Sequence, residues 1–238
     1  MPDSDTLGRP LDGWTAPAPL QAITAEGRYC RLGPLTRQGI EPLFRSLAAG
    51  GAALWTYLPM GPYAGPEDMM AILAMAAARG WKPLAVTDRA SGAVSGTLSF
   101  MRIDAANGSA EIGAVIFSPH MQKSRIGTEA IYLMMRHMFE AGYRRCEWKC
   151  DALNAASRRA ALRYGFSPEG VFRQAAVVKG RNRDTAWFAC TDGDWPAVKA
   201  AFETWLAPGN FDADGRQKQP LSALTRPLLH RPEAPIGV

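Results

Sequence analysis

The sequence predicts a mixed α/β protein of the α+β type, in which helices cover a mostly antiparallel sheet. Three apolar segments of alternating polarity, 83–87, 94–103 and 110–117, follow one another along the chain. The turn residues Ser91-Gly92 and Asn107-Gly108 separate them, and Asn-Gly between two such segments is a strong hairpin signal. These strands therefore form an antiparallel meander, and helical patterns on both sides of it supply the covering layers.

The segments before the meander predict one strand and two helices. Alternation over 28–35 predicts the strand. Apolar residues at helical spacing predict a helix over 37–49, which Gly50-Gly51 ends. A second helix is expected from Pro66 to Arg79, because proline and the acids that follow it are favoured in a first turn.

The segments after the meander predict helices alternating with strands. A long helix is expected to end at Gly142, and its apolar stripe comprises Ala130, Ile131, Met134, Met135 and Met138. We then expect a strand over 145–150, a helix over 157–164, a final hairpin of 170–179 and 183–191, and a closing helix over 195–206.

Length and composition indicate one good-sized domain. The chain has 238 residues, of which 47% are hydrophobic and 21% charged, enough to bury one core. We place this domain at 28–206, after an irregular N-terminal extension of 1–27 whose Trp14 and Leu20 pack on the domain. Residues 207–238 carry five prolines and little periodicity, so this tail is expected to wrap around the domain or to be disordered.

Several classes of protein do not fit the composition. The longest apolar run, 69–78, is too short to span a bilayer, and the N-terminus lacks the features of a secretory signal, so we expect a cytoplasmic protein without a membrane partner. The four cysteines lack C-x-x-C spacing and a neighbouring histidine cluster, which predicts structural thiols and no metal. The net charge of +5 is not gathered in one stripe, so no nucleic-acid partner is expected.

One loop has the composition of an anion site. The segment Gln122-Lys123-Ser124-Arg125-Ile126-Gly127-Thr128 lies between the strand that ends at Phe117 and the long helix. Two cations, small residues and a helix start offer several backbone N–H groups and the positive end of a helix dipole to one anion. The spacing of glycines excludes a P-loop, and no G-x-G-x-x-G follows an early strand. We call residues 122–128 the phosphate cradle.

Two motifs carry a family resemblance over about 28–206. Gln122-x-x-Arg125-x-Gly127 is similar to a Q/R-x-x-G-x-G/A loop, and Asn154-Ala155-Ala156-Ser157 followed by Gly165-Phe166 is similar to an N-x-x-S…G-F segment. Together they resemble the GNAT superfamily of acetyl-coenzyme-A-dependent N-acetyltransferases. The second motif is typical of its RimJ/RimL-like branch, which includes ribosomal-protein N-terminal acetyltransferases. Arg125 replaces the middle glycine, so its backbone must adopt a conformation that a side chain allows, and its guanidinium is available to the phosphates.

The resemblance implies a fold and a set of site residues. It implies a twisted sheet that splays at a central parallel strand pair, which leaves backbone N–H groups unpaired around Val115, Ile116 and Phe117. The cradle would hold the pyrophosphate of acetyl-CoA, the acyl donor. Asn154 would bond the pantetheine or the acceptor, and Ser157 would lie near the cofactor sulfur, where it is our candidate to assist the leaving thiolate. A tyrosine performs that task in many relatives, and Ala161 occupies its position here.

The reaction implied is attack of a primary amine on the thioester carbonyl, and an ammonium must first lose a proton to a carboxylate, directly or through a water. Glu111 is the candidate general base, on the strand that leads into the site. Glu147 and Asp151 on the neighbouring strand are alternatives, and Lys149 takes a place where some relatives have glutamate. Glu111 also has a simple reading as a surface carboxylate on a half-exposed strand, and Ser157 as the N-cap of its helix.

The sequence leaves two acceptors open, a protein N-terminus and a small amine. It also leaves two oligomeric states open, a monomer and a homodimer. The aromatic loop with Trp55, Tyr57, Met60 and Tyr63 either lines an acceptor pocket or covers the core. The leading function is N-acetyl transfer. The alternative from another class is an acyl-CoA-binding regulatory module with little turnover, which the missing tyrosine and the altered glycine permit.

Overall fold

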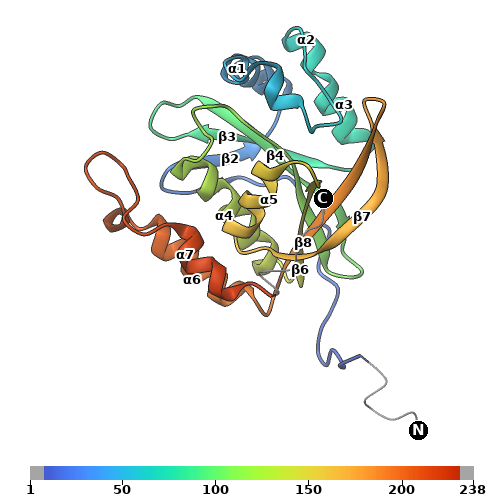
Figure 1. Cartoon of the computed structure of the whole chain (residues 1–238), viewed down its shortest axis with the longest axis vertical. Coiled ribbons are helices and arrows are strands. Elements are labelled where there is room, and N and C mark those ends of the chain that lie inside the picture. Colours follow the sequence, from blue (N-terminus) through green and yellow to red (C-terminus); the bar gives the residue numbers. More distant parts are fainter. Residues whose placement is uncertain (1–7, 231–238) are drawn as a thin grey trace.

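A computed structural model describes residues 8–230, which form an eight-stranded sheet with helices on both faces (Figure 1). The strand order is β1-β2-β3-β4-β5-β6-β8-β7, and every neighbouring pair is antiparallel except β5 and β6. This architecture confirms the predicted fold class. The strands are β1 (Ala25–Glu26), β2 (Cys30–Pro34), β3 (Lys82–Asp88), β4 (Val94–Asp104), β5 (Ser109–Phe117), β6 (Arg145–Asp151), β7 (Ser167–Val178) and β8 (Arg181–Thr191).

Two hydrophobic clusters lie on opposite faces of the sheet, because successive strand residues point to opposite sides. The helices are α1 (Arg37–Ala48), α2 (Pro66–Met69), α3 (Ala71–Ala78), α4 (Arg125–Glu140), α5 (Ala155–Arg163), α6 (Trp195–Leu206) and α7 (Leu221–Thr225), with short 3₁₀ turns at η2 (Gly51–Trp55), η3 (Pro208–Asn210) and η4 (Arg226–Leu228). The first core joins α4, α5 and α6 to Leu84 and Ile112, and the second core joins α1, η2, α2 and α3 to Ala85 and Ile116. Figure 1 shows the two groups of helices on either side of the strands.

Several boundaries differ from the sequence prediction for local reasons. The short strand β1 was not predicted. The helix expected from Pro66 to Arg79 is interrupted at Met70, whose N–H is shared by the carbonyls of Pro66 and Glu67. The final hairpin turns on two residues, Lys179-Gly180, both with positive φ as a tight hairpin turn requires. The remaining helices and strands lie within a few residues of their expected positions.

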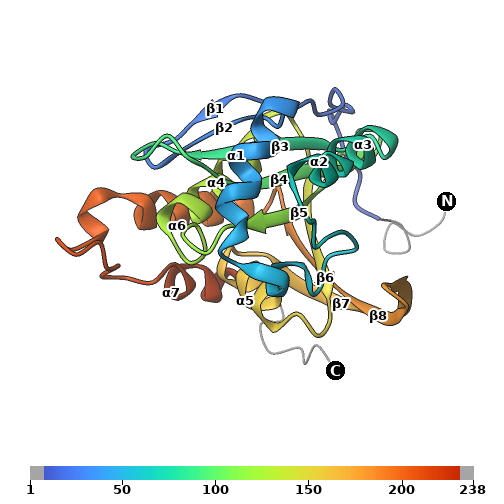
Figure 2. The same ribbon diagram turned by 90° about the horizontal axis from the view of Figure 1, so that it is seen from above.

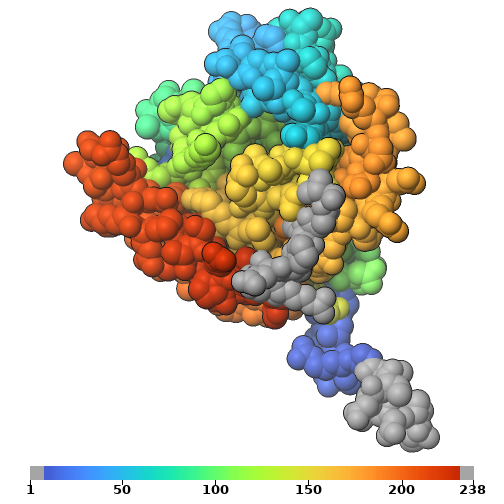
Figure 3. Space-filling model, viewed as in Figure 1, coloured from blue at the N-terminus to red at the C-terminus, as the bar shows by residue number. Residues whose placement is uncertain are grey.

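The chain on either side of 28–206 packs on the sheet and its helices. Leu20 is buried, its N–H donates to the Tyr143 hydroxyl at 3.2 Å, and Arg144 lies over the Trp14 ring. After α6, the C-terminal segment wraps back so that α7 lies beside α5 (Figure 2), with Leu221 and Thr225 fully buried. Figure 3 shows this segment, in red, along the flank of the molecule next to α4 and α5. Residues 231–238 of the predicted tail lie outside the described residues.

A buried carboxylate on α4 holds the turn that leads into β2. Glu129 accepts the backbone N–H groups of Arg28, Tyr29 and Cys30 at 2.7, 2.6 and 2.8 Å. Three backbone donors, one buried and two partly buried, thus depend on a single side chain.

We expect Glu129→Ala to lower the free energy of unfolding by about 3 kcal/mol, because it leaves these donors without an acceptor. The melting temperature should fall by roughly 6–12 °C, measured by thermal unfolding. The matched control is Glu140→Ala, which replaces an exposed glutamate of the same helix. It should change the free energy of unfolding by less than about 0.5 kcal/mol. Equal stability of the two variants would contradict this role of Glu129.

Candidate active site

The phosphate cradle is a tight turn between β5 and α4. The N–H groups of Met121 and Gln122 both donate to the Ser118 carbonyl, and the Gln122 side chain donates to the Phe117 carbonyl at 3.1 Å. Ser124 is the N-cap of α4, and its hydroxyl oxygen accepts the Gly127 N–H at 3.3 Å. Lys123 takes the left-handed backbone conformation, with φ of 56°. These bonds fix the loop without using all of its amides.

Three amides of the cradle are available to a ligand. Within residues 8–230, the N–H groups of Lys123, Arg125 and Ile126 have no backbone or side-chain acceptor. They lie at the positive end of the 16-residue helix α4, where free N–H groups and the helix dipole favour an anion. An ideal Cβ on Gly127 would lie 3.0 Å from the Met121 carbonyl and 3.1 Å from the Phe117 ring, so glycine permits this close turn. The cradle therefore fits a diphosphate.

Arg125 is the first residue of α4 and has ordinary helical backbone geometry, as its place in the motif requires. Its guanidinium carbon lies 4.9 Å from the centroids of both the Tyr29 and the Phe211 rings. The strained conformation that a glycine would relieve falls at Lys123 instead. Arginine at the middle position of the motif is therefore compatible with the loop.

The parallel pair β5–β6 is short, and the two strands then diverge into a fork. They pair only at Ser109↔Arg145, Ala110↔Cys146 and Glu111↔Glu147. Beyond Glu111, β5 has β4 beside it on one edge and no strand on the other, and this stretch includes Val115, Ile116 and Phe117. An extra residue on β5 at the left-handed Ala114 (φ 48°) makes a bulge against β4 at the same level. Unpaired strand edge thus faces the fork, next to the cradle.

The second motif starts α5 beside the same fork. Asn154 is the N-cap, and its side-chain oxygen accepts the Ser157 N–H at 3.0 Å, so the reading of Ser157 as the N-cap is wrong. The Ser157 hydroxyl accepts the indole N–H of Trp148 at 3.0 Å. Arg163, at the other end of α5, donates to the Thr128 hydroxyl of the cradle at 3.0 Å. The fold therefore joins the end of α5, the helix that the second motif begins, to the cradle.

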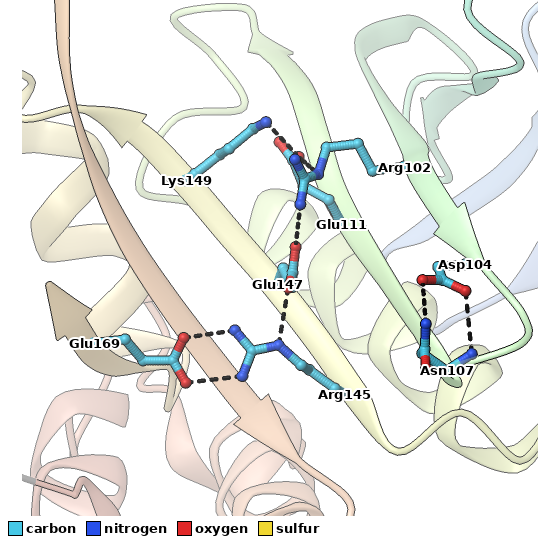
Figure 4. A network of polar contacts seen from close by, with 8 residues as sticks. All are labelled: Arg102, Asp104, Asn107, Glu111, Arg145, Glu147, Lys149 and Glu169. Carbon is cyan, nitrogen blue, oxygen red and sulfur yellow. Dashed lines mark hydrogen bonds and ion pairs between the residues drawn. The ribbon is translucent and has the colours of Figure 1, made fainter. Parts of the chain in front are cut away.

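Glu111 lies at the base of the fork in a network of charges (Figure 4). Its neighbours Ala110 and Ile112 point into the first core, so Glu111 points to the opposite face, as Glu147 and Lys149 do on β6. Its side chain is 3% exposed, and Oε2 lies 3.2 Å from Lys149 Nζ and 3.5 Å from Arg102 Nε. These ion pairs lack hydrogen-bond geometry, which leaves Oε2 buried without a hydrogen-bond donor.

The network continues from Arg102 toward the sheet edge, and an aromatic ring backs its cations. Arg102 also pairs with Glu147 at 3.2 Å, and Arg145 joins Glu147 and Glu169 at 2.8 Å each. Both Arg102 and Lys149 lie over the Trp187 ring, at 4.7 and 5.1 Å from its centroid. Sequence analysis did not single out Arg102 or Trp187. Trp187 lies opposite Lys149 because β6 and β8 pair in the register Lys149↔Trp187. Such pairing of distant strands cannot be predicted from one sequence.

Burial raises the pKa of the Glu111 carboxyl above its usual range, and the positive charges of Lys149 and Arg102 oppose this shift. Asp151, the other alternative base, lies at the end of β6, where its carboxylate accepts the Leu153 N–H at 2.8 Å. Of the three carboxylates, Glu111 is the most deeply buried, and two cations lie within 3.5 Å of its Oε2.

The aromatic loop after η2 packs on the second core and meets the final hairpin. Trp55 and Met60 are buried, Tyr63 packs edge-on against Trp55 at 5.2 Å, and Tyr57 is exposed. Lys179, at the tip of the β7–β8 hairpin, donates to the Trp55 carbonyl at 2.8 Å. The loop covers the second core, and its contact with Lys179 joins it to the β7–β8 hairpin.

The structure also bears on the cysteines, on metal binding and on membrane-spanning helices. All four cysteines are buried free thiols, and burial raises the pKa of Cys150, which confirms structural thiols. Among residues 8–230 no cluster of metal-ligating side chains is found. No helix in that range is long and apolar enough to cross a bilayer.

Comparison with known proteins identifies the family. Residues 30–167 match the model of the acetyltransferase (GNAT) domain. The chain belongs to the GNAT acetyltransferase family. A crystal structure of a GCN5-related N-acetyltransferase from Brucella melitensis is 44% identical, covers 90% of this chain and 99% of its own, and superposes with a TM-score of 0.86. A probable GNAT-family acetyltransferase from Chromobacterium violaceum is 39% identical over 80% of this chain and 97% of its own, with a TM-score of 0.75.

A curated relative has a named acceptor. The ribosomal-protein-serine acetyltransferase of Escherichia coli K12 is 35% identical over 95 residues, which is 40% of this GNAT chain and 52% of the relative. The chain thus aligns with about half the length of that relative. These similarities support an N-acetyltransferase of the branch that the second motif indicated.

Proposed function

We propose that this GNAT enzyme transfers an acetyl group from acetyl-CoA to a primary amine by direct attack of the amine on the thioester. The observation that carries the proposal is a single juxtaposition. Three free amides of the cradle, the unpaired edge of β5 and the buried carboxylate of Glu111 surround one fork in the sheet. A diphosphate-bearing thioester and an amine require these three features together.

The amides of Lys123, Arg125 and Ile126 would bind the donor's diphosphate. The β5 edge at Val115–Phe117 would donate to the thioester oxygen, where negative charge develops, and one such preorganised donor is worth roughly 3 kcal/mol of barrier. The other residues of the cradle would shape the loop. The side chains of Gln122 and Thr128 donate to backbone carbonyls, and the Gly127 N–H donates to the Ser124 hydroxyl. Gly127 also leaves no room for a side chain.

Glu111 would accept the proton that the acceptor ammonium must lose. Ser157 is the candidate to donate to the leaving sulfur, since its oxygen accepts from Trp148 and its O–H remains a donor, with the Cys150 thiol as its neighbour. Asn154 would use its amide N–H₂, which makes no hydrogen bond within residues 8–230, to bond the pantetheine or the acceptor. A thiolate is a fair leaving group near neutrality, so a hydroxyl donor is enough.

The pH profile tests Glu111 through its neighbour. Because the carboxylate form accepts the proton, activity should fall as the pH drops through the raised pKa of Glu111. Lys149→Met removes the nearest cation, so the pKa should rise further and the acid limb of kcat/KM should move to higher pH. Lys199→Met, which removes a lysine paired with exposed acids, is the control and should leave the limb in place. An unmoved limb in Lys149→Met would count against Glu111 as the titrating base.

The acceptor class follows from the relatives as a proposal. The Escherichia coli relative is named for the serine of a ribosomal protein, which favours a protein N-terminus over a small amine. A thiol-release assay with acetyl-CoA and two panels, peptides that begin with serine and small primary amines, tests both points. Turnover with any amine supports the enzyme. Binding of acetyl-CoA without thiol release above background would favour the regulatory module. The cytoplasmic location stays a prediction from the sequence.

A further inference from the structure

We infer that the segment 207–220 is part of the acyl-donor site, because Phe211 and Tyr29 hold the Arg125 guanidinium rigidly beside the cradle to bind the donor's phosphates. The inference rests on the proposed function and adds to it a positioning role for residues that lie outside the strands of the sheet. Phe211 acts through Arg125, so it is a positioning residue.

The charge of Arg125 is unbalanced within the described chain. In residues 8–230 its guanidinium has no carboxylate and no hydrogen-bond acceptor, in contrast to Arg145, which pairs with Glu147 and Glu169. A cation in the first turn of a helix also opposes the positive end of the helix dipole. Lys123 adds a second positive charge two residues earlier. Such an arrangement is unfavourable until an anion binds, and the free amides of the cradle belong to the same turn.

The two rings leave the guanidinium little freedom. Both centroids lie 4.9 Å from its carbon, within the range of cation–π contact, and the rings lie 6.3 Å from each other. The tip of the C-terminal loop approaches from a third side, since an ideal Cβ on Gly215 would lie 3.4 Å from Arg125 Nη2. A long side chain that is already ordered loses less entropy on binding.

The C-terminal segment is itself fixed to the fold. The Phe211 ring packs edge-on against Trp205 of α6, with 5.1 Å between the ring centroids. Its backbone forms an antiparallel β-bridge with Gln217, and the Gln217 side chain accepts the Trp205 indole N–H at 2.7 Å. The Asn210 side chain bonds the Trp205 and Gln219 carbonyls. On the other side, the Tyr29 hydroxyl donates to the Leu206 carbonyl and its N–H to Glu129 of α4. Both rings are thus anchored independently of Arg125.

The test is a double-mutant cycle on the full chain, with coenzyme A as the probe in isothermal titration calorimetry. Arg125→Ala should raise the Kd about tenfold, and Phe211→Ala should raise it about fivefold. The double variant should bind about as weakly as Arg125→Ala alone, because Phe211 has nothing left to position. In turnover assays Phe211→Ala should raise the KM for acetyl-CoA and leave kcat unchanged.

Two controls separate this role from general stability. Phe211→Tyr keeps the ring and should bind within about twofold of the wild type. Arg136→Ala removes another α4 arginine that lies over a tyrosine, about 16 Å further along the helix, and should not affect binding. Independent, additive losses from Phe211→Ala and Arg125→Ala would overturn the inference, as would wild-type affinity in a folded Phe211→Ala. Failure of the wild type to bind coenzyme A would instead refute the proposed function.

Discussion

Replacing Gly127 by valine is expected to abolish measurable binding of coenzyme A. Even a Cβ at this position would press on the Met121 carbonyl at 3.0 Å and on the Phe117 ring at 3.1 Å. The branched side chain must therefore displace the turn that presents the free amides of Lys123, Arg125 and Ile126. We expect the Kd to rise at least about 100-fold, equivalent to about 2.7 kcal/mol of binding free energy.

Calorimetry and thermal unfolding of two further variants make this prediction decisive. Gly127→Ala makes the same contacts with less bulk and should give an intermediate Kd in a folded protein. Gly33→Ala, at a glycine with open space around its Cβ position, should bind like the wild type. If folded Gly127→Val still bound coenzyme A with wild-type affinity, residues 122–128 would not be the donor site.

Replacing Glu111 by glutamine is expected to lower kcat about 10²- to 10⁴-fold with little change in the KM for acetyl-CoA. Glutamine has the same shape but cannot accept a proton, and it leaves Lys149 and Arg102 facing a neutral group. The loss should persist at every pH, in contrast to Lys149→Met, which keeps the base and shifts its titration. Steady-state kinetics over a pH series measures both effects.

Glu147→Gln is the matched variant, because Glu147 belongs to the same network and contacts Arg102 and Arg145. We expect its kcat to stay within about tenfold of the wild type. Similar losses in the two variants would mean that the network acts as a structural unit and that neither carboxylate is the base. Thermal unfolding of each variant shows whether the buried charges left behind have destabilised the fold.

Local signals in the sequence were enough to predict most of the helices and strands and the position of the turn that we call the cradle. Asn107-Gly108 marks the β4–β5 hairpin, and the stripe of Ala130 to Met138 marks α4, because turn chemistry and periodicity are properties of neighbouring residues. The family motifs supplied the positions of Asn154 and Ser157. The serine's role as helix cap was misassigned, since a cap three residues earlier satisfies the same amides equally well.

Contacts between distant segments were beyond prediction. Trp187 is 85 residues from Arg102, and Phe211 is 86 residues from Arg125, so no spacing rule connects either pair. The interruption of the expected helix at Met70 depends on a shared backbone bond with little signature in the sequence. Each of these features arises from packing of elements that only the complete sheet brings together.

The short parallel pair means that the sheet is two half-sheets, five strands and three strands, joined along a seam of three residue pairs. The ion pairs of Glu111 with Lys149 and of Arg102 with Glu147 cross that same seam. The proposed active site thus lies where the sheet is least continuous. Substitutions that extended the pairing of β5 and β6 would strengthen the sheet and would close the fork in which we propose that the reaction takes place.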